Sequence, residues 1–235
     1  TLAFWDVEGE HLKTIYIGRM PESGHETIAS DLELELRAIL RERPDLDVSF
    51  ASDGDALQWQ YLEGIAAALP NQDKRTTTFN LDFWHAAGYV EAAARAALED
   101  EDDAKVQAAE WKASLKHHVH GAKRVLKSMR YFRDQVRGAR RETIETSINY
   151  LSNQAAAGRM RYRTSRDQGH PIGSGPVEVA AKMLVNVRMC RSGARYEQHG
   201  GQTILAFRSA LCSDRFGMLW EHLHQSYTAK VLEAA

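Results

Sequence analysis

The stretch LDVSFASDGD at residues 46–55 decides the fold class of this chain. Its first six residues form a short apolar run, which predicts a β-strand that ends at the turn-forming residues SDGD. Apolar residues at helical spacing follow over 56–69, and a second strand is predicted over 76–83. Strand, helix and strand in this order are typical of an α/β fold.

The segment before this stretch extends the pattern. Two runs of β-branched and aromatic residues at 1–5 and 12–17 flank a Gly-containing spacer and predict a hairpin. A helix is predicted over 27–43, because its apolar residues recur at helical spacing and Pro44 ends it. Residues 1–85 therefore read as β-β-α-β-α-β.

The rest of the chain is predicted to be helical apart from one loop. Residues 86–163 contain no Pro and are rich in Ala, and the glycine-rich loop at 169–176 follows them. Further helices are predicted at 177–189, 202–212 and 218–235. The expected domain organisation is 1–85, a basic helical insertion at 86–165, and a closing part at 166–235. We expect these residues in the core: Trp59, Trp84, Trp111, Trp220, Leu211, Leu219 and Leu223.

The net charge of −2 over 235 residues hides a strong asymmetry. Residues 1–104 hold 8 Lys and Arg against 22 Asp and Glu, whereas residues 105–215 hold 21 against 8. Such a basic half indicates a surface that binds a polyanion, with basic clusters at 123–124, 140–141 and 159–163. The alternative is that these side chains are only solvated on helix faces.

The composition also excludes several classes of protein. No uninterrupted apolar stretch approaches the roughly 20 residues that span a membrane, so no membrane partner is expected. Residues 1–10 do not read as a signal peptide. The two cysteines, Cys190 and Cys212, make no disulfide framework, so a cytoplasmic location is expected.

Three carboxylates follow predicted strands or the glycine-rich loop. Asp53 directly follows one strand, Asp82 lies near the end of the next with His85 three residues on, and Glu178 opens the helix after the loop. Carboxylates that converge at one sheet edge suit Mg²⁺ or Mn²⁺, and two such ions activate water in phosphodiester cleavage. Each has a structural alternative: Asp53 as a turn residue, Asp82 as a helix cap, and Glu178 as a complement to a helix dipole.

The helix that carries Glu178 adds a basic residue on the same face. Glu178 and Lys182 lie four residues apart, with Arg188 further along the helix. A cation one turn beyond a metal-binding carboxylate is placed to hold the phosphate of a bound strand. The alternative is an ordinary stabilising Glu–Lys pair.

Several short motifs share a characteristic order and spacing. They are IGRMPE at 17–22, SDG at 52–54, DFWHA at 82–86, RMRY at 159–162, IGSGPVE at 172–178, KMLV at 182–185, RMCRSG at 188–193 and GGQTIL at 200–205. In this order they resemble bacterial insertion-sequence transposases of the ISKra group, from Thr1 to about Trp220.

The resemblance implies a DDE transposase with an RNase H-like catalytic fold, which is a mixed sheet with flanking helices interrupted by a helical insertion. Three acids in such enzymes bind two Mg²⁺ or Mn²⁺ ions for DNA cleavage and strand transfer. Asp53 corresponds to the second acid and Glu178 to the third, so both are expected to be catalytic and to bind metal. Asp82 and His85 correspond to active-site support, with Asp82 a lesser candidate for the second acid. DNA contacts are expected from Lys182, Arg188, Arg191, Arg140, Arg141 and Arg161.

The start of the sequence departs from the group. The first acid of related transposases lies on a strand upstream of the hairpin, and this sequence opens at the hairpin. We therefore expect the first strand and first acid to be missing, with Asp6 as the only early replacement. The hypothesis is a truncated transposase that binds transposon-end and target DNA and transposes poorly or not at all. The alternatives are a non-catalytic DNA-binding remnant and a metal-dependent nuclease of the same fold; a homodimer is implied by the resemblance alone.

Overall fold

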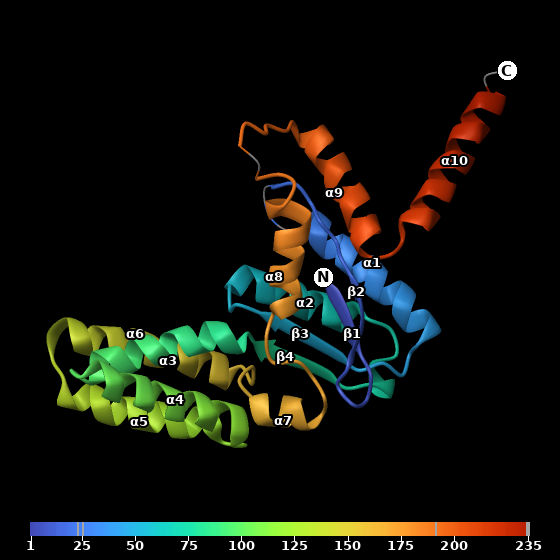
Figure 1. Cartoon of the computed structure of the whole chain (residues 1–235). Helices are drawn as coiled ribbons and strands as arrows, with labels where there is room; N and C mark the ends of the chain where they lie inside the picture. The colour runs from blue at the N-terminus through green and yellow to red at the C-terminus, as the bar shows by residue number, and fades with distance from the viewer. Residues whose placement is uncertain (23, 25, 191, 234–235) are drawn as a thin grey trace. The chain divides into compact units, whose positions relative to one another are not determined.

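The structure is a computed structural model that divides into two compact units, which are described separately. Unit 1 comprises Thr1–Ala38 and Gly175–Ala235, and unit 2 comprises Ile39–Ser174. Figure 1 labels the elements of both units. The residues that the structure describes are 1–22, 24, 26–190 and 192–233.

A hairpin opens unit 1. It joins β1 (Leu2–Trp5) to β2 (His11–Ile15), which run antiparallel. Asp6 closes its turn, because one carboxylate oxygen accepts the backbone N–H of Glu8 at 3.0 Å and that of Glu10 at 2.8 Å. The predicted hairpin is confirmed, and the carboxylate of Asp6 is engaged in turn geometry.

Helices make up the rest of unit 1. α1 (Glu26–Glu42) begins in this unit, and α8 (Gly175–Ala180) runs directly into a π-helix at Ala181–Asn186. α9 (Gln198–Cys212) and α10 (Phe216–Glu233) follow, and α10 turns away from α9 in Figure 1. The continuous α-helix predicted over 177–189 is wrong at this point, since the hydrogen-bond pattern widens after Ala180.

Hydrogen bonds connect the segment between β2 and α1 to α9 and to the residue that follows α9. The backbone N–H of Tyr16 donates to the Ser213 hydroxyl at 2.9 Å, and the side chain of Gln202 accepts the N–H of Met20 at 2.9 Å. A Cβ added at Gly18 would lie 3.1 Å from Leu184, so this close approach requires glycine or a shift of its neighbours. These contacts hold residues 16–20 against α9 and the π-helix within unit 1.

Unit 2 is built on a parallel strand pair. β3 (Val48–Ser52) and β4 (Thr77–Leu81) are connected through α2 (Ala56–Ala68) and a 3₁₀ turn at Gln72–Lys74. The register pairs each residue of β3 with one of β4, so both strands end together. Their carboxyl ends therefore place the residues that follow, at 53 and 82, at one edge of the pair.

Aromatic packing holds α2 against these strands. The rings of Phe50 and Phe79 stack with centroids 5.4 Å apart, and Trp59 of α2 meets Phe79 edge-on at 6.3 Å. Asp55 caps α2 by accepting the N–H of Gln58 at 2.9 Å. The β-strand, helix and β-strand predicted from residues 46–83 are thus confirmed.

A helical bundle follows β4. Its helices are α3 (Phe83–Ala97), α4 (Glu101–His117), α5 (Gly121–Gln135) and α6 (Gly138–Ala156), and the short α7 (Tyr162–Asp167) comes after them. α3 packs on α4 and α6, and α5 also packs on α4 and α6, so these four helices lie side by side (Figure 1). Ala86, Ala93 and Ala94 of α3 are fully buried, and their small side chains let the neighbouring helices approach closely.

The α/β class is confirmed, but the strands do not form one mixed sheet. In the residues described, β1 pairs only with β2 and β3 only with β4, which makes two two-stranded sheets. The hairpin and the crossover through α2 give each strand a nearby partner, and no described strand lies along the outer edges of β1 or β3. No described helix is both long and apolar enough to cross a bilayer.

Some of the expected core residues are exposed. Trp59 and Trp111 are buried, but Trp84 is 65% exposed and Trp220 is 61% exposed. Trp84 stands in the first turn of α3, and Trp220 lies on α10, which packs on α9; both side chains stay largely open to solvent. The core prediction is wrong for these two residues and for the exposed Leu211 and Leu223.

Candidate active site

Asp53 is the first residue beyond β3, and its side chain is exposed. One carboxylate oxygen accepts the backbone N–H of Asp55 at 3.3 Å and the hydroxyl of Ser52 at 3.4 Å, both long hydrogen bonds. No ion pair of the described residues includes this carboxylate. Asp53 therefore presents oxygen ligands that no cation of the described residues neutralises.

The backbone of the Asp53–Gly54 turn is held by α6. The hydroxyl of Tyr150 donates to the carbonyl oxygen of Asp53 at 2.7 Å, and the amide of Gln154 donates to that of Gly54 at 3.4 Å. Burial, followed by the neighbouring Tyr89 and Asp53, raises the pKa of Tyr150, so this hydroxyl stays a neutral donor. Gly54 has φ +100°, and a Cβ there would overlap the Tyr150 hydroxyl.

Asp82 is buried at the corresponding position after β4, and both its oxygens are occupied. One oxygen caps α3 by accepting the N–H groups of Trp84 at 2.7 Å and His85 at 2.9 Å. The other accepts the N–H of Ser174 at 2.5 Å and also the Ser174 hydroxyl. Burial raises the pKa of Asp82, but these hydrogen bonds outweigh it and hold that pKa below its usual range.

The contacts of Asp82 anchor the glycine-rich loop. Ser174 belongs to that loop, and the carbonyl of Ile172 accepts the N–H of Phe83 at 2.9 Å. A Cβ at Gly173 would lie 3.3 Å from the ring of Trp84. Of the two roles considered for Asp82, the helix cap is therefore what its geometry forms, together with a tie to the loop.

His85 is exposed and contacts aromatic rings. Its ring centroid lies 5.6 Å from that of Tyr89 and 5.8 Å from that of Tyr150, and the two tyrosines stack at 4.0 Å. His85 therefore packs on the side chain that holds the Asp53 turn. Its bond to Asp82 is made by its backbone, and none joins their side chains among the hydrogen bonds of the described residues.

Glu178 belongs to unit 1, where it lies exposed in α8. The Glu178–Lys182 pair that was the structural alternative for these residues is absent from the ion pairs of the described chain. Lys182 is in the π-helix, whose wider turn shifts side chains away from α-helical spacing. Lys182 and Arg188 are both exposed, and Arg191 lies outside the described residues.

The basic residues expected to contact DNA in unit 2 differ in their surroundings. Arg140 donates to the carbonyls of Ala96 at 2.7 Å and Ala97 at 3.0 Å, and it pairs with Glu99 at 3.0 Å. Arg140 therefore caps the end of α3. Two others stay open to solvent: Arg141 is 3.8 Å from Asp134, and Arg161 is exposed with no carboxylate near it among the residues described.

Metal binding depends on how many of these carboxylates are free. Asp53 offers a hard oxygen ligand, whereas the oxygens of Asp82 are already hydrogen-bonded. In the described part of the chain, no group of three or more His, Cys, Asp or Glu side chains is arranged to hold a metal ion. Asp53 therefore fits a single ligand position.

Sequence reasoning missed Tyr150, Gln154 and Ser174, which lie 97, 100 and 92 residues from their partners. Tyr150 and Gln154 are four residues apart, and that spacing places them on one helix face. This shared helix face is the one signal in the sequence that indicates a common partner for Tyr150 and Gln154.

The comparisons with known proteins add no family. No family model, no curated protein and no solved structure matches this chain.

Proposed function

We propose that this chain is the catalytic portion of a DDE transposase, which cleaves DNA and transfers the cut strand. One observation carries the proposal: an exposed carboxylate, Asp53, stands on a glycine turn at the carboxyl end of a parallel strand and has no cationic partner in the described structure. The carboxyl ends of parallel strands are where α/β proteins place functional groups.

The proposal assigns Asp53, in unit 2, as a ligand of Mg²⁺ or Mn²⁺, and Glu178, in unit 1, stays a separate candidate ligand by the resemblance alone. The bound ions would supply an activated water and stabilise the leaving oxygen. Tyr150 and Gln154 keep the Asp53 turn in place. Asp82 ties down the loop that leads into α8, and His85 packs on Tyr150.

An RNase H-like fold is part of the same proposal. It is supported by the order β-β-α-β-α-β, then a helical bundle, then the glycine-rich loop and a Glu-bearing helix. The outer edge of β3 has no partner strand among the residues described, and a mixed sheet of this kind would add its further strand there. The resemblance of the ordered motifs to the ISKra group supports the same family.

A second candidate function is DNA binding without catalysis. The observation that favours it is a pair of exposed lysines one turn apart on α5, Lys123 and Lys127, that form no ion pair with any described residue. Such residues bind phosphates without sequence choice, so affinity for any duplex should fall steeply between about 50 and 200 mM salt.

Nicking of supercoiled plasmid DNA in the presence of Mn²⁺ separates the two functions. Asp53→Asn should abolish nicking, whereas Asp73→Asn should leave it unchanged, since Asp73 is exposed and its side chain forms no hydrogen bond or ion pair with a described residue. Salt-sensitive DNA binding with no metal-dependent nicking would overturn the catalytic proposal and favour the second function. Joining of a labelled duplex to the plasmid would distinguish a transposase from a nuclease.

A further inference from the structure

The helical part of unit 2 contains a cavity of about 370 Å³ where α5 begins and α6 ends. This volume lies within the roughly 300–1,000 Å³ typical of small-molecule sites. Its walls come from the loop before α5, one face of α5, the last turn of α6 and the link to α7. All of these elements belong to one compact unit.

The lining of this cavity is basic. His120, Lys123, Arg130 and Arg161 all contribute to it, and no Asp or Glu does. Of the three permanently charged side chains, only that of Arg130 makes a polar contact with a described residue, the Ser152 hydroxyl at 3.4 Å. The positive charge of the cavity is therefore left unneutralised by the described residues.

Other arginines of unit 2, by contrast, form ion pairs with nearby carboxylates. Arg133 pairs with Glu145 at 3.1 Å and with Asp134 at 3.0 Å, and Arg163 pairs with Asp167 at 2.7 Å. Each of these cations is neutralised locally, whereas those around the cavity are not. An unneutralised group of cations in a concave site attracts an anion.

The floor of the cavity is apolar. Leu126 and Met160 line it, and each is only 6% exposed. A simple inorganic anion would gain nothing from such a floor, whereas a ligand with a phosphate and a flat ring would use both parts. Guanidinium groups match phosphate oxygens in a bidentate geometry, and apolar side chains pack against the face of a base.

We propose that this cavity binds a nucleotide, with its phosphate held by Lys123, Arg130 and Arg161 and its base against Leu126 and Met160. The site is separate from the metal-dependent chemistry proposed for Asp53 and needs no metal ion. The same chemistry can come from a nucleotide within single-stranded DNA or from a free nucleotide.

Titration of the full chain without metal, in EDTA, tests the site with two probes. One is a fluorescein-labelled oligothymidylate of twelve nucleotides, read by anisotropy, and the other is AMP, read by calorimetry. Lys123→Gln, Arg130→Gln and Arg161→Gln should each weaken binding about tenfold, since each removes a charge-assisted contact. Binding of the oligonucleotide alone identifies a strand as the ligand, and binding of AMP identifies a free nucleotide.

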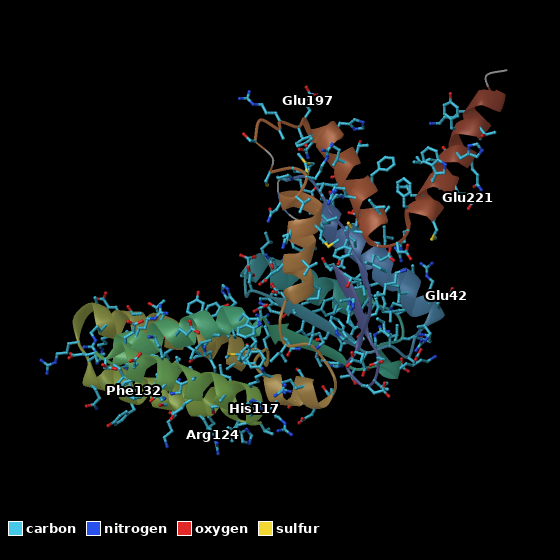
Figure 2. The ribbon with its side chains drawn as sticks, in the orientation of Figure 1. Glu42, His117, Arg124, Phe132, Glu197 and Glu221 are labelled. Atoms are coloured by element: carbon cyan, nitrogen blue, oxygen red, sulfur yellow. The ribbon has the colours of Figure 1, made fainter. Side chains whose placement is uncertain are left out.

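Arg124→Gln is the matched control. Arg124 is adjacent to Lys123 and exposed, but it does not line the cavity, and Figure 2 shows it on the outer side of the helices. It should change affinity less than twofold, the small effect expected of a charge outside the site. Equal losses for Arg124→Gln and Lys123→Gln would overturn the proposal in favour of diffuse attraction.

Ala156→Trp tests the cavity without changing charge. Ala156 lines the cavity and is exposed, so the larger side chain can fill the space at little cost to folding. We expect it to abolish binding of whichever probe the wild type binds. Unchanged binding in this variant, or binding of neither probe by the wild type, would overturn the proposal. Asp53→Asn should bind normally, so failure of the cleavage proposal is distinguishable from failure of this one.

Discussion

The hydroxyl of Tyr150 donates a 2.7 Å hydrogen bond to the backbone carbonyl of Asp53, across 97 residues of sequence. This hydrogen bond joins the turn between β3 and α2 to helix α6. Gln154, one turn further along the same helix, bonds the next carbonyl. The helical bundle therefore positions the carboxylate that stands at the end of β3.

Tyr150→Phe should loosen this turn without removing the ring that stacks on Tyr89. Loss of one hydrogen bond is expected to lower the free energy of unfolding by about 0.5–1.5 kcal/mol. Amide hydrogen exchange at Gly54 and Asp55 should accelerate. Tyr131→Phe is the control, since Tyr131 is 64% exposed and its hydroxyl donates to no described residue. Equal effects of both variants would show that the Asp53 turn does not depend on this bond.

Two glycine substitutions should have opposite effects. Gly54→Ala should destabilise unit 2 by more than about 1 kcal/mol, because φ is +100° and the new Cβ would overlap Tyr150 and lie 3.0 Å from Leu81. Gly64→Ala lies inside α2 with nothing near its Cβ, so it should stabilise by about 0.5–1 kcal/mol. Denaturant unfolding of both variants measures this, and a neutral Gly54→Ala would contradict the proposed constraint.

Asp82 should make stability depend on pH in the acid range. Its pKa is lowered in the folded chain, so its contribution is present above the usual carboxyl pKa of about 4 and is lost as the pH falls through the folded-state value. Asp82→Asn should cost about 1.5–3 kcal/mol at pH 7, because Ser174 loses a charged acceptor. The difference from wild type should shrink between about pH 5 and 2.

Asp73→Asn is the reference for that measurement. The Asp73 side chain is exposed and bonds to none of the described residues, so its substitution should leave the pH profile of unfolding unchanged. A constant difference between Asp82→Asn and wild type across the acid range would mean that Asp82 does not act through its charge.

Arg140 and Arg141 are adjacent in sequence but should respond differently. Arg140→Gln removes the bonds to Ala96 and Ala97, so it should lower the free energy of unfolding by about 1–2 kcal/mol. Arg141→Gln should change stability by less than about 0.5 kcal/mol, because its ion pair with Asp134 is exposed.

DNA affinity separates the same two variants in the other direction. If Arg141 contacts a phosphate, Arg141→Gln should reduce the dependence of log affinity on log salt by about one, whereas Arg140→Gln should not. Identical salt slopes for both variants would place the phosphate contact elsewhere on the basic surface.

The order of elements was predictable because it follows local rules. Apolar spacing identified α1 and α2, and the turn residues at 52–55 marked the end of β3. The start of α3 was placed three residues late, at 86 and not at Phe83, because Asp82 caps the helix directly. A cap of this kind was considered for Asp82, but its strength depends on burial that no local pattern reveals.

The π-helix at Ala181–Asn186 was not predictable from the sequence. The guanidinium of Arg208 in α9 donates to the carbonyl of Met183 at 3.1 Å, and the N–H of Val187 bonds back to Lys182 at 3.0 Å, the i→i−5 pattern of a π-helix. The donor to the Met183 carbonyl, Arg208, therefore comes from another helix, which no local pattern predicts. The wider π-helical turn also changes the α-helical spacing assumed for Glu178 and Lys182.

The sequence by itself determined which residues end the strands of unit 2, because apolar runs, turn formers and a glycine act within a few residues. Asp53 and Asp82 were both identified in this way. Only the tertiary structure decided that they differ. Asp82 is buried and hydrogen-bonded by Ser174, whereas Asp53 is exposed, its carboxylate accepts only two long local hydrogen bonds among the described residues, and Tyr150 holds its backbone carbonyl. The physical reason is that a carboxylate is free or occupied according to donors that lie about a hundred residues away in the chain.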